Sequence, residues 1–118
     1  MRSNVEKSVI RHLSRAMEPV AVRAYVPAEK PKRLLTVERV GGESDGVALD
    51  RPRIAIQSWA TTLDDASELA IAADEAMASL IGSYGVTSVA RESLYRHVTA
   101  AGEARYQAVY RITAHIDL

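Results

Sequence analysis

Histidine side chains are the first candidates for chemistry, because the chain contains no cysteine to act as a nucleophile or a thiolate ligand. The three histidines are His12, His97 and His115. None of them has the spacing to a second histidine or to a carboxylate that a metal site requires. We therefore interpret each histidine as a solvated or structural residue.

Two pairs of adjacent carboxylates are the next candidates, Asp64 with Asp65 and Asp74 with Glu75. General acid–base catalysis needs groups that converge on one reacting atom. Neighbouring positions on a helix point apart, so a capping turn and a solvated helix face explain these pairs better. We predict no catalytic residue, no metal ligand and no cofactor-binding residue, and a protein that is not an enzyme.

The glycine-rich stretch GGESDG at residues 41–46 is the strongest turn signal in the chain. It lacks the Walker lysine and precedes a predicted strand rather than a helix, so it does not match a phosphate-binding loop. Glu43, Asp45 and Asp50 offer oxygen ligands for calcium, but their spacing differs from that of an EF-hand. We interpret this stretch as a hairpin-type loop.

Composition limits the classes of partner. The chain has 118 residues, and its formal net charge is zero, from 15 basic and 15 acidic residues. General nucleic-acid binders and anionic-membrane binders are normally basic, so we expect neither a membrane partner nor a sequence-specific nucleic-acid partner. No apolar run approaches the ~20 residues that span a membrane, and the N-terminus lacks the apolar core of a signal peptide. We expect a protein made in the cytoplasm, where it stays until it joins an assembly.

Hydrophobic periodicity predicts two helices and five strands. In chain order, the predicted ranges are helix 3–17, strands 20–26, 34–40 and 53–59, helix 63–81, and strands 86–95 and 105–116. Ser3 and Glu6 have the spacing of a capping box for the first helix, and Thr62 is the predicted N-cap of the second. An apolar stripe along the second helix is predicted to end at Leu80 and Ile81.

Strands grouped between helices indicate an α+β fold rather than a doubly wound parallel fold. We predict a mainly antiparallel sheet of about four to five strands with two helices packed on one face, in the order α-β-β-β-α-β-β. The chain shows no internal repeat or linker, so residues 1–118 are predicted to form a single domain. The sheet face opposite the helices has a mixed composition rather than a purely polar one.

Two predicted loops carry opposite charge. Residues 27–33 have a surplus of two positive charges, and residues 41–51 have a surplus of two negative charges. Both are explained as solvated loops, or as the two halves of a head-to-tail contact that closes into a ring. Trp59 fits either the core or an interface. The candidate subunit or partner interface consists of Lys30, Lys32, Arg33, Glu43, Asp45, Asp50, Arg51 and Trp59.

Three stretches carry a resemblance to a known family. They are a strand that ends in Val40-Gly41-Gly42, a strand introduced by Asp50-Arg51-Pro52, and Trp59-Ala60 before an alanine-rich helix. With the amphipathic N-terminal helix and the closing strand YQAVYRIT at residues 106–113, the chain resembles the tail terminator, or tail completion, proteins of long-tailed bacteriophages. The resemblance covers nearly the whole chain in element order and length.

The resemblance implies a structural virion protein that forms a ring, typically a hexamer, on the head-proximal end of the tail tube. Such a ring stops tube polymerisation and offers a surface for joining to the head. The implied partners are further copies of the chain, the tube protein and the connector or neck proteins, and the genome would pass through the ring. Two alternatives remain: a neck or head-closure protein of the same virion, and a small non-catalytic ligand-binding or regulatory domain.

Overall fold

The computed structural model describes residues 4–44, 48–97 and 103–115 of the chain. These residues form two helices and one five-stranded sheet, which confirms the predicted α+β fold and its element order. The elements are α1 (Val5–Ala16), β1 (Ala21–Arg23), β2 (Leu34–Ser44), β3 (Leu49–Trp59), α2 (Leu63–Ala78), β4 (Val86–Arg96) and β5 (Arg105–His115).

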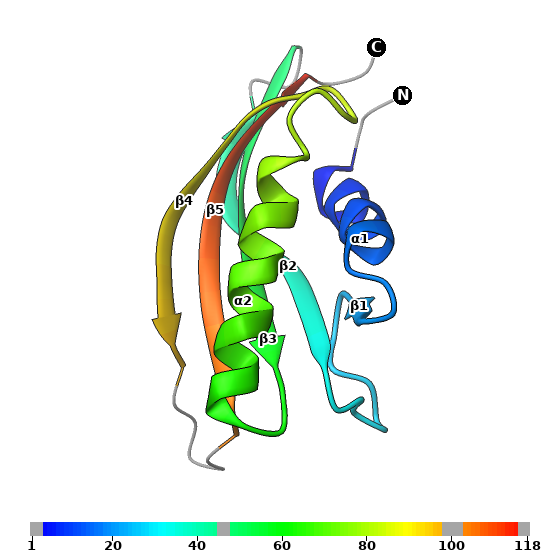
Figure 1. Cartoon of the computed structure of the whole chain (residues 1–118). Helices are drawn as coiled ribbons and strands as arrows, with labels where there is room; N and C mark the ends of the chain where they lie inside the picture. The colour runs from blue at the N-terminus through cyan, green and yellow to red at the C-terminus, as the bar shows by residue number, and fades with distance from the viewer. Residues whose placement is uncertain (1–3, 45–47, 98–102, 116–118) are drawn as a thin grey trace.

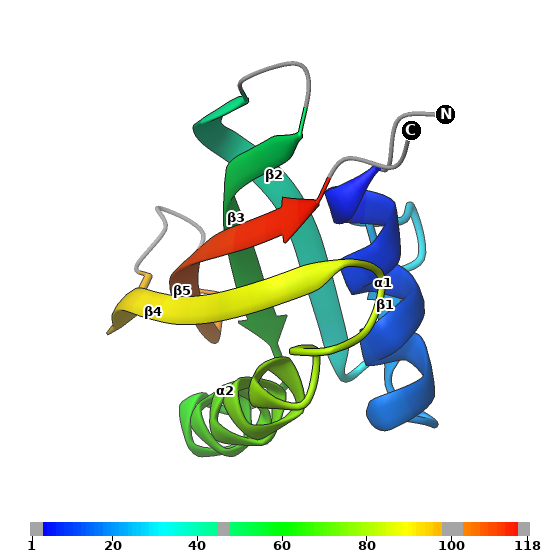
Figure 2. The same ribbon diagram turned by 90° about the horizontal axis from the view of Figure 1, so that it is seen from above.

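The strands lie in the order β1-β2-β3-β5-β4. Every neighbouring pair is antiparallel except β1 and β2, which run parallel. Both helices pack on the same side of the sheet, which we call the inner face, and the opposite side is the outer face (Figures 1 and 2). The sheet edges are therefore the very short β1 and the long β4.

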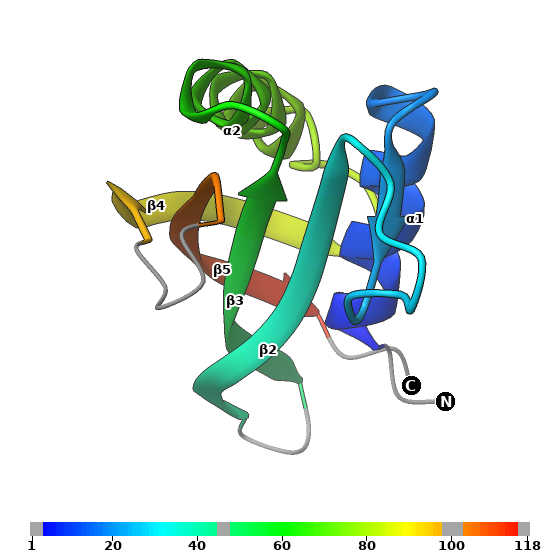
Figure 3. The same cartoon turned by 90° about the horizontal axis from the view of Figure 1, so that it is seen from below.

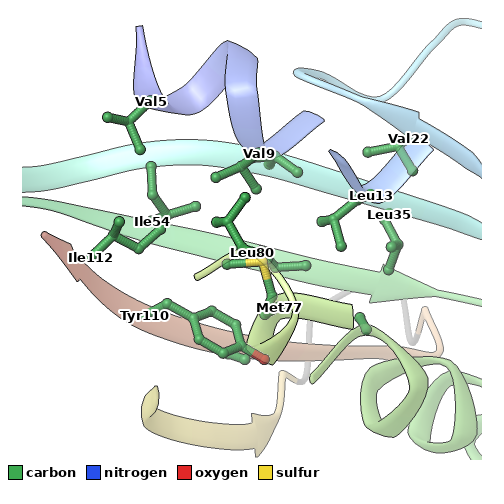
Figure 4. Packing of buried hydrophobic residues seen from close by; sticks show 14 of the residues in the cluster. Val5, Val9, Leu13, Val22, Leu35, Ile54, Met77, Leu80, Tyr110 and Ile112 are labelled. Atoms are coloured by element: carbon green, nitrogen blue, oxygen red, sulfur yellow. The ribbon is translucent and has the colours of Figure 1, made fainter. Parts of the chain in front are cut away.

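The core lies between the helices and the inner face, where side chains of α1, α2 and the sheet meet (Figure 4). Strand alternation was predicted correctly for β5, because Ala108, Tyr110, Ile112 and Ala114 are all buried on this face. His12 of α1 joins the two helices, since its Nε2 donates a hydrogen bond to the Ala76 carbonyl of α2 at 2.9 Å.

The start of α1 differs from the prediction. Asn4 is the N-cap, and its side-chain oxygen accepts a hydrogen bond from the Lys7 backbone N–H at 3.1 Å. The Glu6 carboxylate does not close a capping box, because it accepts from the Arg39 backbone N–H of β2 at 2.8 Å. Ser3 lies outside the described residues. The predicted N-cap of α2 is confirmed, since the Thr62 hydroxyl accepts from the Asp65 N–H at 3.1 Å.

The end of α2 also differs from the prediction. The helix stops at Ala78, three residues before its predicted end. Leu80 is still fully buried, whereas Ile81 is 51% exposed. The apolar stripe fails at Ile81 because the chain has already left the helix, so helical spacing no longer decides which face a side chain takes.

The hairpin between β2 and β3 is longer than the sequence indicates. Residues 41–44 and 50–52, which were predicted as loop, are paired strand, and Leu49 pairs with His115 of β5. Gly42 permits this, because its φ is +99° and a Cβ at this position would lie against the Arg51 carbonyl and Pro52. Gly42 of β2 and Pro52 of β3 are cross-strand partners, although glycine and proline are usually found in turns.

The first predicted strand is shorter than expected. Only Ala21–Arg23 pairs with β2, through Leu34, Leu35 and Thr36, and residues 24–33 form a connection. The parallel pairing arises because this connection carries the chain back along the edge before β2 begins. The turn predicted at residues 99–104 lies largely outside the described residues.

Candidate functional site

The outer face of the sheet is the candidate site, because both helices cover the inner face (Figures 2 and 3). A groove of about 400 Å³ lies on it, across β2, β3 and β5. Its floor includes Thr36, Ala55, Gln57 and Gln107, and residues 24–26 form one wall. Among the lining residues, the large apolar side chains are exposed: Tyr25 by 69%, and Val26 and Val40 by 43% each.

Trp59 anchors one end of this face. Its side chain is only 5% exposed, and its indole N–H donates a hydrogen bond to the Thr36 hydroxyl at 3.1 Å. The Arg105 guanidinium lies 4.3 Å from the ring centroid and the Lys30 ammonium lies 4.9 Å from it, which are cation–π distances. Trp59 thus fastens the 24–33 connection to the sheet.

A chain of hydrogen bonds crosses the outer face from this anchor. Arg105 donates to the Gln57 side-chain oxygen at 3.1 Å, and the Gln57 amide donates to Gln107 at 2.8 Å. The Gln107 amide then donates to the Tyr95 hydroxyl at 2.7 Å. The chain links β3, β5 and β4, so the amides on the groove floor have fixed orientations.

Arg105 is buried and carries a charge that the described residues do not neutralise. Its second guanidinium nitrogen lies 2.7 Å from His97 Nδ1, which must accept because a guanidinium can only donate. Its Nε is buried and has no acceptor among the described residues. Neutral acceptors and the Trp59 ring therefore hold this cation, an arrangement that makes this end of the face electropositive.

The other half of the outer face is a charged cluster. The Glu92 carboxylate accepts from Arg53 at 2.9 to 3.3 Å and from Arg111 at 3.2 Å. The hydrogen bond from Arg53 is the main cause that lowers the pKa of Glu92. An open hollow of about 430 Å³ next to this cluster is lined by Arg51, Arg53 and Arg111 together with Gly42 and Glu43.

The predicted basic loop is largely engaged within the subunit. Lys30 lies 4.0 Å from Glu103 as well as over Trp59, and Arg33 lies 3.3 Å from Asp65. Lys32 is exposed. The structure thus brings Lys30 and Trp59 together, a contact that the sequence did not indicate. Among the basic residues of this loop, Lys32 is the one left most available.

The predicted acidic loop is also partly engaged. Asp50 is 7% exposed, and its carboxylate accepts hydrogen bonds from the two terminal guanidinium nitrogens of Arg39 at 2.7 and 2.9 Å. Asp50 therefore serves packing within the subunit. Glu43 and Arg51 are exposed and face each other as cross-strand partners. Asp45 lies outside the described residues.

The two predicted loops lie at opposite ends of β2 (Figure 1). Ten residue steps at ~3.3 Å separate the ends of this strand, about 33 Å in all. The loops therefore cannot meet within one subunit. A head-to-tail contact between copies through these loops stays a prediction.

On the inner face, Asp74 is partly exposed, but its carboxylate is bound by other residues of the subunit. The Tyr110 hydroxyl donates to it at 2.8 Å, and Arg91 lies 3.2 Å away. Burial, followed by the hydrogen bond to Asp74, raises the pKa of Tyr110 well above its ordinary value. The triad ties α2 to β4 and β5.

The sequence missed the polar members of the outer-face network, Gln57, His97, Arg105 and Gln107. Alternation along β5 placed Gln107 on the side away from the helices, but only strand pairing shows that it meets Gln57 and Tyr95. Within the described ranges, no group of three or more histidine, cysteine or carboxylate side chains could hold a metal ion. No helix among the same residues is long and apolar enough to cross a membrane.

No family model matches the chain, and no curated protein matches it either.

Proposed function

We propose that this chain is a structural assembly subunit of the tail-terminator type. In this role, copies form a ring on the head-proximal end of a tail tube, end its polymerisation and offer a surface to the head connector. The observation that carries the proposal is the outer face of the sheet, which holds a groove with exposed Tyr25, Val26 and Val40. Exposed aromatic and apolar side chains that border a rigid polar floor are typical of protein interfaces.

The form of the groove favours a protein partner over a small molecule. Small-molecule pockets bury most of the surface of their ligand. Here the wall residue Tyr25 is itself 69% exposed, so the groove is shallow on that side. The resemblance in element order, together with the α+β fold, supports the choice of a tail-terminator role among assembly proteins.

A tube-growth assay tests the proposal. The cognate tube protein is polymerised in the presence of increasing amounts of this chain, and tube lengths are measured by electron microscopy. We expect the mean length to fall as the ratio of this chain to tube protein rises, with extra density at one tube end. Unchanged growth would contradict the proposal. Binding to the connector without any effect on tubes would instead favour a neck or head-closure protein.

A further inference from the structure

The side of α2 that faces away from the sheet carries a stripe of exposed residues. Positions 64, 68, 71, 75 and 78 recur at steps of three and four, so they share one face of the helix, opposite its buried face. All five are exposed, and Ile71 is exposed by 54%. Along the helix, the stripe is acidic at Asp64 and Glu68, apolar at Ile71 and acidic again at Glu75.

The acidic residues of this stripe are available for a partner. The helix α2 contains five acidic residues and no basic one. The ion pairs of α2 among the described residues involve Asp65, with Arg33, and Asp74, with Arg91, and neither of these carboxylates belongs to the stripe. The stripe therefore presents three negative charges around one exposed isoleucine.

The outer face of the sheet has cations at both ends of an uncharged centre. At one end lies Arg105, whose guanidinium is held by neutral acceptors and by the Trp59 ring. At the other end, Arg51, Arg53 and Arg111 line the open hollow, and the Arg111 side chain is 65% exposed. The centre between the two ends consists of Ala55, Gln57, Gln107 and Val109.

The carboxylates of the outer face leave a positive charge at each end. Glu92 binds both Arg53 and Arg111, and Glu43 lies across the hairpin from Arg51, so two carboxylates meet three guanidinium groups at the hollow. At the other end, Glu103 lies 4.0 Å from Lys30, and the Arg105 charge remains. Glu38 lines the groove on β2, so the part of the face that suits an acidic helix lies over β3 and β5.

The spacing of charges on the two surfaces agrees. Asp64 and Glu75 are eleven residues apart, about 16 Å along a helix. Arg105 and Arg111 are six residues apart, about 20 Å along a strand. Arginine and glutamate side chains are long enough to bridge the difference of about 4 Å.

We propose that the exposed stripe of α2 in one copy packs on the outer face of the sheet in the next copy. The acidic ends of the stripe meet the cationic ends of the face, and Ile71 covers the uncharged centre between them. Two unlike surfaces make a heterologous contact, which can close into a ring. The inference rests on the ring-forming role proposed above and identifies the surfaces that join its subunits.

The fold sets the direction of the helix in this contact. Within one subunit, α2 begins shortly after Trp59 and runs back along the sheet, so that Asp74 reaches Tyr110 (Figure 1). Rotation about a ring axis parallel to the strands leaves this direction unchanged from copy to copy. Glu75 of one copy then lies near Arg111 of the next, while the start of the helix lies near Arg105.

Cysteine cross-linking tests the contact, because the chain has no cysteine of its own. Ile71 and Gln107 lie on opposite sides of one subunit, so a short link between these positions must join two copies. We expect the double variant Ile71→Cys with Gln107→Cys to give a ladder of oligomers with a short bismaleimide, either alone or bound to tubes. A mixture of the two single variants should stop at dimers.

The matched control is Ile81→Cys with Gln107→Cys. Ile81 is an isoleucine of similar exposure, 51%. It lies past the end of α2, and the last helical residue, Ala78, is already about 10 Å along the axis from position 71. Both double variants lose the hydrogen bonds of Gln107, so this loss does not distinguish them. We expect no ladder from the control.

Three cross-linking results would overturn the inference. The first is monomers alone from the 71–107 pair, both free and on tubes. The second is equal ladders from the 71–107 pair and the control. The third is a link from position 107 to the tube protein in place of a ladder, which would make the outer face a surface for the tube.

Charge reversal in the 71–107 variant tests the direction of the helix. We expect Glu75→Lys to lower the ladder yield at least about threefold at low salt, because an attraction to Arg111 becomes a repulsion. Adding Arg111→Glu should restore part of the yield. The control is Glu18→Lys, which changes the net charge equally at an exposed position outside the stripe and should leave the yield unchanged. Equal yields from Glu75→Lys and Glu18→Lys, or no recovery in the combined variant, would contradict the contact.

Failure of this interface and failure of the proposed function give different results. Tubes capped by a ring that forms no 71–107 ladder would refute the interface but not the function. A 71–107 ladder from a protein that leaves tube growth unchanged would refute the function but not the interface.

Discussion

The hydrogen bond from the Tyr110 hydroxyl of β5 to Asp74 of α2 gives a direct test of how these two elements pack. In Tyr110→Phe the ring stays in place, so no cavity forms, and only the 2.8 Å hydrogen bond to Asp74 is lost. A hydrogen bond to a charged group contributes about 1.5–3 kcal/mol. The Asp74 side chain is 37% exposed and keeps Arg91, so water can replace part of the contact. We therefore expect a loss of about 1.5 kcal/mol in the free energy of unfolding at pH 7.

The same variant should change how stability depends on pH. The folded state holds the Tyr110 proton with a raised pKa, while the unfolded chain releases it near the ordinary tyrosine pKa of 10.0. The contribution of Tyr110 is therefore fully present below pH 10 and falls as pH rises above it, by at most about 1.4 kcal/mol per pH unit. Tyr110→Phe should flatten this decline between pH 10 and 11.

Urea denaturation at pH 7, 10 and 11 measures both effects. The matched control is Tyr84→Phe, since Tyr84 also packs against the core but the described residues show no hydrogen bond from its hydroxyl. We expect a change below about 0.5 kcal/mol for the control. If Tyr110→Phe is as stable as the parent at pH 7 and shows the parental decline at high pH, the reasoning about this triad is wrong.

Three further predictions concern the fold and the outer face. Leu69→Ala, at a fully buried position on α2, should lower the free energy of unfolding by about 2–5 kcal/mol in chemical denaturation, and parental stability would refute the assigned helix face. Gly42→Ala should cost clearly more than Gly82→Ala, because both have positive φ but only at Gly42 would a Cβ meet backbone; equal thermal shifts would count against the hairpin geometry. Glu92→Gln should reduce the stability that the parent loses as pH falls below about 4.5, since the Glu92 pKa is lowered in the folded state; identical acid titrations of the two proteins would argue against the Arg53 contact.

Local patterns predicted much of the fold from the sequence. The alternation of β5 placed Ala108, Tyr110 and Ile112 on the helix side, and each is buried there. Thr62 was predicted as an N-cap from its own chemistry and its place before an apolar stripe, and its hydroxyl does cap α2. These features depend on residues close together in the chain, so periodicity and capping rules suffice.

The errors arise where pairing between distant residues overrides local preference. Gly42 and Pro52 favour a turn individually, but opposite each other they fit a hairpin in which a side chain at 42 would clash. Asp50 was assigned to a charged loop, because nothing in the sequence shows that Arg39 reaches it across the hairpin. The hydrogen-bond network of the outer face could not be predicted for the same reason, since Gln57 and Gln107 are 50 residues apart in the sequence.

The most direct test of the central claim is an electron-microscopy reconstruction of the ends of tail tubes incubated with this chain. The account predicts a closed, rotationally symmetric ring at one end only. Density at neither end, or density along the tube wall while the tubes continue to grow, would contradict it.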